Sequence, residues 1–143
     1  MNQYPENRQS IVIQNRVSAG EKLADFLLRY VNSNNIANDD HNDLKLIIEE
    51  TFTNIISSAR ERSDYHDITV ELKCDGKTIV ITFSDTGVAF NPISYNSKNI
   101  GNTPPHEGGM GIHIIRSLSD ALNYKRVGDR NVFTITKHYT KRQ

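Results

Sequence analysis

The sequence lacks several features that define large classes of protein. Its 143 residues contain a single cysteine, Cys74, which excludes an internal disulfide and favours a reducing compartment. No stretch approaches the ~20 consecutive apolar residues that a membrane-spanning helix requires. The polar residues 1–9 do not have the pattern of a secretory signal. We therefore expect a cytoplasmic protein that has no membrane partner.

Net charge is also lacking, because 17 Lys and Arg residues balance 17 Asp and Glu residues. A nucleic-acid-binding domain normally carries a basic patch or stripe, so direct binding to nucleic acid is not expected. The basic residues near the C-terminus are interpreted as a solvated tail: Lys137, His138, Lys141 and Arg142. The chain suits one globular domain, assigned to residues 10–143 after a flexible tail at residues 1–9.

Hydrophobic periodicity predicts a mixture of strands and helices. Strands are predicted at 10–17, 68–73, 78–84, 123–127 and 131–137, and helices at 20–32, 43–62 and 109–122. Residues 33–42 are predicted to be a loop, Asp43 a helix cap, and Asp75-Gly76 a hairpin turn. This order predicts an α+β fold, a two-layer sandwich of a mostly antiparallel, mixed sheet with helices on one face.

The second predicted helix carries two polar residues one turn apart, Glu50 and Asn54. Residues four apart lie on the same side of a helix, so the two side chains should point to the same place. The apolar residues fall on the opposite side: Leu44, Ile48, Phe52, Ile55 and Ala59. Taken alone, the pair is more readily explained as part of an ordinary solvent-facing polar stripe.

Residues 85–92, Asp-Thr-Gly-Val-Ala-Phe-Asn-Pro, follow a predicted strand. The carboxylate of Asp85 at the strand end can accept a hydrogen bond from an exocyclic amine. Gly87 would let the backbone approach a flat ring closely, because it has no side chain. A plain Asp-x-Gly turn is the simpler interpretation, but the segment is longer and more specific than such a turn requires.

Residues 108–111, Gly-Gly-Met-Gly, lie at the start of the third predicted helix. Glycines at a helix start leave free N–H groups at the positive end of the helix dipole, where a phosphate can bind. Residues 86–107 show no periodicity and are rich in Asn, Gly, Ser and Pro. A loop of this length in a small domain is usually functional or disordered.

In this order, the three segments resemble the ATP-binding motifs of the GHKL (Bergerat-fold) superfamily. From about residue 10 to residue 138 the chain is similar to the anti-sigma-factor serine/threonine kinases, the small stand-alone branch of that superfamily. The resemblance implies ATP and Mg²⁺ as cofactors. It implies that Glu50 is the general base, that Asn54 helps to hold Mg²⁺, and that Asp85 reads the adenine amine. The other residues that it places at the nucleotide are Gly87, Ala89, Phe90, Gly108, Gly109, Met110, Gly111 and Ile112.

The same resemblance implies partners. The protein would sequester a sigma factor, phosphorylate a STAS-domain anti-anti-sigma protein on Ser or Thr, and form a homodimer. Residues 93–107 would be a lid over the phosphates. The sequence departs from many relatives in having Ser57 and Ser58 where they carry a basic residue. Lys98, His106 and Arg116 are the alternative candidates for neutralising the phosphates.

Two other interpretations remain. A nucleotide-responsive regulatory binding protein without kinase activity would use the same motifs, although it would not need the carboxylate of Glu50. A detached histidine-kinase catalytic domain is disfavoured, because the sequence shows no helix pair for dimerisation and phosphotransfer. The five histidines show no metal-ligand spacing.

Asp85 gives the first testable prediction. The chain should bind adenine nucleotides with Mg²⁺ and prefer them to guanine nucleotides, because a carboxylate suits an amine and not a carbonyl. Asp85→Asn should cost a charge-assisted hydrogen bond, on the order of 1.5–3 kcal/mol of binding free energy. Isothermal titration calorimetry measures both effects, and equal affinity for ATP and GTP would overturn the assignment.

Overall fold

The computed structural model describes residues 7–58, 66–93 and 107–143, with the backbone alone for 107–111. The elements in chain order are β1 (Asn7–Gln14), the 3-10 helix η1 (Val17–Ala19), α1 (Gly20–Ser33), α2 (Asn38–Ser58), β2 (Asp67–Cys74), β3 (Thr78–Asp85), α3 (Glu107–Leu118), β4 (Ala121–Val127) and β5 (Arg130–His138). In these ranges no helix is both long enough and apolar enough to span a bilayer.

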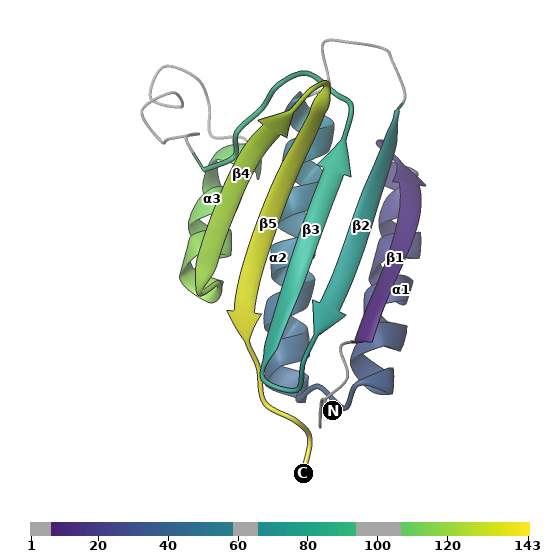
Figure 1. The fold of residues 1–143 in the computed structure, drawn as a ribbon, viewed down its shortest axis with the longest axis vertical. Helices are drawn as coiled ribbons and strands as arrows, with labels where there is room; N and C mark the ends of the chain where they lie inside the picture. The colour runs from purple at the N-terminus through teal and green to yellow at the C-terminus, as the bar shows by residue number, and fades with distance from the viewer. Residues whose placement is uncertain (1–6, 59–65, 94–106) are drawn as a thin grey trace.

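The strands form one five-stranded sheet in the order β1-β2-β3-β5-β4. The pairs β1–β2, β2–β3, β3–β5 and β4–β5 are all antiparallel, whereas the sequence predicted a mostly antiparallel, mixed sheet. Helices α1, α2 and α3 lie on one face of the sheet, and the opposite face is open (Figure 1). The predicted α+β fold with helices on one face is confirmed.

The core lies between the sheet and the helices. Strands β2 and β3 bury every second residue, as their alternating sequences predict. On β3 this inward row is Ile79, Ile81, Phe83 and Asp85, so a charged residue ends a row that is otherwise apolar. The inward row of β5 has a polar residue at each end: Asn131, Phe133, Ile135 and Lys137.

Two predicted boundaries near the N-terminus are wrong. Residues 7–9 belong to β1 and not to a tail, because the ladder to β2 continues to the pair Asn7 and Cys74. Helix α2 begins at Asn38, inside the predicted loop, and Asp43 is therefore an interior residue and not a cap. The acidic residues Asp39 and Asp40 lie in its first turn, where the helix dipole favours negative charge. Residues 59–62 of the predicted helix lie outside the described residues.

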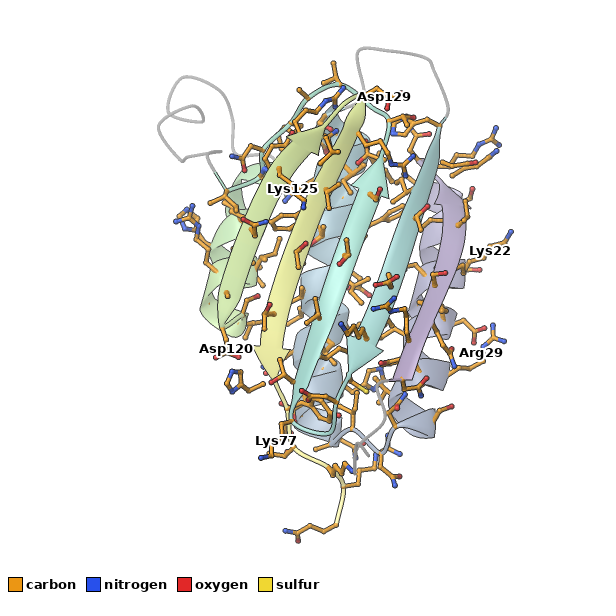
Figure 2. The ribbon with its side chains drawn as sticks, viewed as in Figure 1. Lys22, Arg29, Lys77, Asp120, Lys125 and Asp129 are labelled. Carbon is orange, nitrogen blue, oxygen red and sulfur yellow. The ribbon has the colours of Figure 1, made fainter. Side chains whose placement is uncertain are left out.

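The third helix is also shorter than predicted. Helix α3 ends at Leu118, and Leu122 belongs to β4, where it pairs with Ile135 of β5. The apolar spacing from Ile115 through Leu118 to Leu122 fits a helix, but the strand ladder takes the last of these residues. The two hairpin turns lie at opposite ends of the sheet, with Asp129 at one end and Lys77 at the other (Figure 2).

Lys137 is not part of a solvated tail, because only 8% of its surface is exposed. Its ammonium donates to the carbonyl of Leu118 at 3.2 Å and lies 3.4 Å from Asp43 and 3.9 Å from Asp40. The carbonyl of Leu118 is one of those that the end of a helix leaves without an intrahelical partner. Lys137 therefore joins the end of α3 to the beginning of α2 beneath the sheet.

Lys137→Met should remove this cation while keeping most of the apolar stem. We expect a loss of about 2–3 kcal/mol in the free energy of unfolding, below the range for a fully buried pair because Asp43 is partly exposed. Urea denaturation measures it. Lys125→Met is the matched control, since Lys125 lies on the open face of β4 (Figure 2). Equal midpoints for the two variants would contradict a structural function of Lys137.

Candidate functional site

The candidate site lies at the end of the sheet where β3 finishes and β2 and β5 begin (Figure 1). The register places Asp85 between Ile68 of β2 and Asn131 of β5. Side chains alternate along a strand, so Asp85 follows Phe83 on the inward face and its carboxylate points toward the helices. The sequence pattern of β3 thus delivers a carboxylate into the interior.

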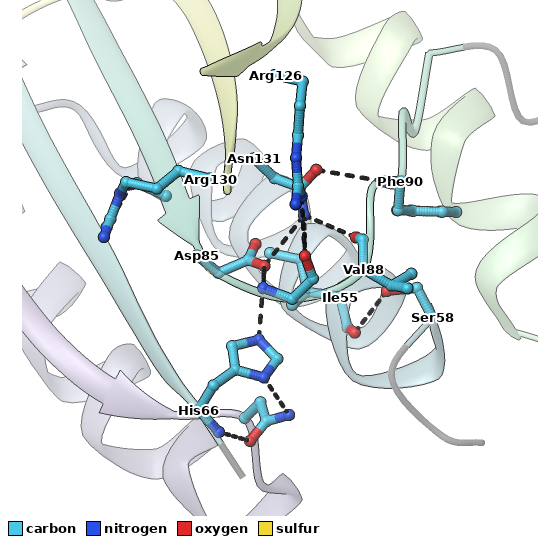
Figure 3. A network of polar contacts seen from close by, with 12 residues as sticks. Ile55, Ser58, His66, Asp85, Val88, Phe90, Arg126, Arg130 and Asn131 are labelled. Atoms are coloured by element: carbon cyan, nitrogen blue, oxygen red, sulfur yellow. Dashed lines mark hydrogen bonds and ion pairs between the residues drawn. The ribbon is translucent and has the colours of Figure 1, made fainter. Parts of the chain in front are cut away.

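Asp85 is 4% exposed, and one oxygen of its carboxylate is bound by neighbouring donors. Its Oδ1 accepts hydrogen bonds from the Gly87 backbone N–H at 2.8 Å and from Asn131 Nδ2 at 3.2 Å. Nε2 of His66 lies 3.5 Å from the same oxygen (Figure 3). The two hydrogen bonds replace part of the hydration that the carboxylate loses on burial.

Asn131 holds the segment that follows Asp85. Besides its bond to Asp85, its Nδ2 donates to the carbonyl of Val88 at 2.8 Å. Its Oδ1 accepts from the Phe90 N–H at 3.2 Å and from the Tyr124 hydroxyl at 2.5 Å. One buried amide therefore fixes both the carboxylate and the path of the chain from residue 85 to residue 90 (Figure 3).

The side chains of two arginines near the turn at Gly87 point in different directions. Nη1 of Arg126 donates to the carbonyl of Gly87 at 2.8 Å. Arg130 donates to the hydroxyl of Ser84 at 2.8 and 3.1 Å, and its guanidinium points away from Asp85 (Figure 3). Arg126 thus fixes the turn from the β4 side, while Arg130 lies on the open face of the sheet.

Asn54 reaches the same region from α2. Its side chain is 3% exposed, and its Oδ1 has no hydrogen-bond partner in the described part of the structure. The sequence placed Asn54 away from the apolar side of the helix, and this is wrong, because Asn54 shares a cavity with Phe83 and Phe133 of the sheet. A buried carbonyl oxygen without a partner is rare in folded proteins and calls for an explanation.

This unpartnered oxygen fits a magnesium ion. Mg²⁺ prefers oxygen ligands, keeps several waters and is commonly held by few protein groups together with substrate phosphates. The described residues contain no group of three or more His, Cys, Asp or Glu side chains that could hold a metal by themselves. Asn54 is therefore suited to be one protein ligand of a phosphate-bound metal.

Asn54 and Asp85 line one cavity. The remaining lining residues come from α2, from the loop after β3 and from strands β3, β4 and β5: Thr51, Ile55, Ser58, Phe83, Phe90, Pro92, Tyr124, Asn131 and Phe133. The cavity volume of about 20 Å³ holds a single water molecule. A larger ligand enters only if a wall moves, and the loop wall of Phe90 and Pro92 is the part that belongs to no helix or strand.

The other predicted site residues lie at varying distances from this cavity. Glu50 is half-buried on α2, one turn before Asn54, and does not line the cavity. Gly87 contributes its N–H to Asp85, and Ala89 is exposed. A Cβ on Gly87 would lie 2.9 Å from Asp85 Oδ1 and 3.0 Å from His66, so the site requires glycine there.

The third predicted segment forms the first turns of α3. Gly108, Gly109 and Gly111 belong to this helix, whose backbone alone is described there. Ile112 is buried in the core at 2% exposure. Of the cations proposed to neutralise phosphates, Arg116 donates to the carbonyl of Ile93. Lys98, His106, the side chain of Met110 and most of the predicted lid lie outside the described residues.

Sequence reasoning missed Asn131, Tyr124 and His66. Asn131 could not be found because the pairing of β3 with β5, 46 residues apart, leaves no local signal. His66 could have been found. A two-residue turn at Asp75-Gly76 would pair Cys74 with Lys77 and set His66 directly opposite Asp85. The observed register is shifted by two residues and sets Ile68 opposite Asp85, which keeps His66 on the same face, two residues further along.

An open antiparallel sheet covered by helices on one face, with a buried carboxylate and a metal-suited amide in one cavity, is consistent with an ATPase domain. Residues 13–137 match the histidine kinase-like ATPase domain family, and the chain belongs to that family.

Three relatives illustrate its place in the family. The chain is 29% identical over 113 residues to the serine-protein kinase RsbW of Bacillus mycoides, across 75% of this chain and 69% of that one. It is 24% identical over 106 residues to an anti-sigma F factor of Anoxybacillus flavithermus, across 72% and 73% of the two chains. It is 27% identical over 97 residues to the serine/threonine-protein kinase BtrW of Bordetella bronchiseptica, across 66% and 68%.

Asn131 provides a test of the site's construction. Asn131→Leu should lower the free energy of unfolding by about 2–4 kcal/mol, because it leaves Asp85 and the Val88 carbonyl buried with fewer partners. Amide exchange at Gly87 and Phe90 should accelerate. Asn123→Leu, at an exposed position of β4, is the control. Unchanged exchange at both amides would show that Asn131 does not hold this segment.

Proposed function

We propose that this chain is an anti-sigma factor and an ATP-dependent protein serine/threonine kinase. It would bind Mg-ATP at the cavity between α2, β3 and β5, and transfer the terminal phosphoryl group to a Ser or Thr of a STAS-domain anti-anti-sigma protein. The observation that carries this proposal is the pairing, in one cavity, of the buried carboxylate of Asp85 with the unpartnered oxygen of Asn54.

The Asp85 side of the cavity is suited to adenine. Oδ1 of Asp85 is engaged by Gly87 and Asn131, and we assign Oδ2 as the acceptor for the exocyclic amine. Because Asp85 is only 4% exposed, a hydrogen bond to its carboxylate competes little with water. Phe90 and Pro92 supply apolar surface for the base, once the loop that carries them has moved outward.

The Asn54 side of the cavity is suited to the phosphates. Oδ1 of Asn54 would be a ligand of Mg²⁺, which when bound neutralises charge on the transferring phosphoryl group. Glu50 lies one turn earlier on the same helix and would take the proton from the attacking hydroxyl. Its position outside the cavity suits a group that meets the substrate protein rather than the base.

The proposed regulatory partners are inferred from the names of the relatives. Two of them bear the names serine-protein kinase and anti-sigma F factor, and the chain aligns with most of the length of each. We infer binding of a sigma factor, assembly as a homodimer and a cytoplasmic location from this kinship. A nucleotide-responsive binder without kinase activity would keep Asp85 and Asn54 but would gain nothing from Glu50.

Substitutions on α2 should separate catalysis from binding. Glu50→Ala should leave Mg-ATP affinity nearly intact and lower phosphotransfer by roughly the 10²–10⁴ of a lost general base. Asn54→Ala should instead weaken Mg-ATP binding itself. Calorimetry gives the affinities, and labelled ATP with the STAS protein encoded nearby gives the transfer rate.

Glu49→Ala is the control, because Glu49 is the exposed neighbour of Glu50 on α2. The phosphate should appear on Ser or Thr and survive acid, unlike phosphohistidine. Transfer at the wild-type rate by Glu50→Ala, or no transfer by the wild type to any cognate STAS protein, would replace the kinase by the nucleotide-responsive binder.

A further inference from the structure

His66 lies beside Asp85 because of the strand register. Ile68 pairs with Asp85, and His66 precedes Ile68 by two residues, so it shares the inward face. The side chain is 15% exposed, and its Nε2 is buried without a hydrogen-bond partner in the described ranges. This nitrogen is 3.5 Å from Asp85 Oδ1, close enough for a small ring rotation to complete a hydrogen bond (Figure 3).

Asn15 holds the other side of the imidazole. The backbone N–H of His66 donates to Asn15 Oδ1 at 2.9 Å, and the N–H of Asn15 donates to the His66 carbonyl at 3.1 Å. The first of these bonds fixes the orientation of the Asn15 amide, because its oxygen must face the His66 N–H. Its NH₂ group therefore faces Nδ1 of His66, at 3.1 Å.

This arrangement determines the histidine tautomer. An NH₂ group can only donate, so Nδ1 of the neutral ring must accept, and the ring proton belongs on Nε2. The Nε2–H bond is then directed toward Asp85. The opposite tautomer would set two donors against each other at Asn15, and a lone pair against the carboxylate at Asp85.

We propose that His66 is a positioning residue for the nucleotide site, held by Asn15 as the Nε2–H tautomer so that it fixes Oδ1 of Asp85 and leaves Oδ2 for the adenine amine. The proposal rests on the proposed function, because it assigns Asp85 to adenine. His66, Gly87 and Asn131 surround Oδ1 from three directions. Since the Cβ of any other residue at position 87 would lie 3.0 Å from the ring, Gly87 also makes room for His66.

The first experiment needs no nucleotide. Long-range ¹H–¹⁵N correlation spectra of the full-length wild type at neutral pH distinguish the two tautomers of each histidine. We expect the neutral ring of His66 to carry its proton on Nε2. A proton on Nδ1 would overturn the proposal. The Nε2 resonance should also shift when Mg-ATP is added, which a histidine with a purely structural function would not show.

The second experiment measures nucleotide affinity by calorimetry. His66→Leu should weaken Mg-ATP binding by roughly three- to tenfold, the range for an ordinary hydrogen bond, because His66 acts on adenine only through Asp85. Binding of Mg-GTP should change less, so the preference for adenine should fall. His66→Gln should restore most of the affinity, because its amide N–H lies near the place of Nε2. His138→Leu, at an exposed position on the opposite end of β5, is the control.

The outcomes separate this proposal from the proposed function. If the wild type does not bind Mg-ATP, the proposed function fails, and the tautomer alone decides whether Asn15 holds His66 as described. If the wild type binds and folded His66→Leu binds equally well, the positioning of Asp85 by His66 is wrong. Should His66→Leu not fold, the comparison of His66→Gln with the wild type and the shift of the Nε2 resonance still decide the matter.

Discussion

Burial of the Asp85 carboxylate is the constraint on which the candidate site depends. An ionised carboxylate removed from water is costly unless donors replace the lost hydration. Here two donors come from separate parts of the chain, the turn at Gly87 and the start of β5 at Asn131. Nε2 of His66, the residue before β2, lies 3.5 Å from the same oxygen. The shape of the loop after β3 follows from this requirement, because the same Asn131 that serves Asp85 also binds Val88 and Phe90.

Helix α2 belongs both to the core and to the site. Its apolar residues pack on the sheet, while Asn54 near its last turn lines the cavity and Asp43 near its first turn meets Lys137. The inward rows of the sheet therefore have a buried charge at both ends, a carboxylate at one end and an ammonium at the other. The two ends differ in their partners, because Lys137 is paired with two carboxylates, whereas Asp85 shares a cavity with the unpartnered oxygen of Asn54.

Local patterns predicted the fold because strands that bury one face alternate strictly. The rows from Ile68 on β2 and from Ile79 on β3 identify both strands, and Asp75-Gly76 identifies the turn between them. Two predictions were wrong where tertiary packing overrides local sequence. The Asn- and Asp-rich stretch from Asn38 was predicted to be a loop but forms the first turn of α2. Leu122 fits the helical spacing but pairs with Ile135 in the sheet. The candidate site was predictable at Asp85 and Asn54, which lie in recognisable motifs. Asn131 was not, since its position follows from a pairing between distant strands.

The order of strands in the sheet has a consequence for how the molecule is made. Strand β5 follows every other strand in the chain, yet it lies inside the sheet, between β3 and β4. During synthesis the edge of β3 stays open until β5 arrives, and an open strand edge is a template for pairing with other chains. The same event brings Asn131 to Asp85, so a nascent or truncated chain without β5 does not have the complete candidate site. A ligand of this pocket would act on the completed chain alone and, by mass action, would draw the folding equilibrium toward it.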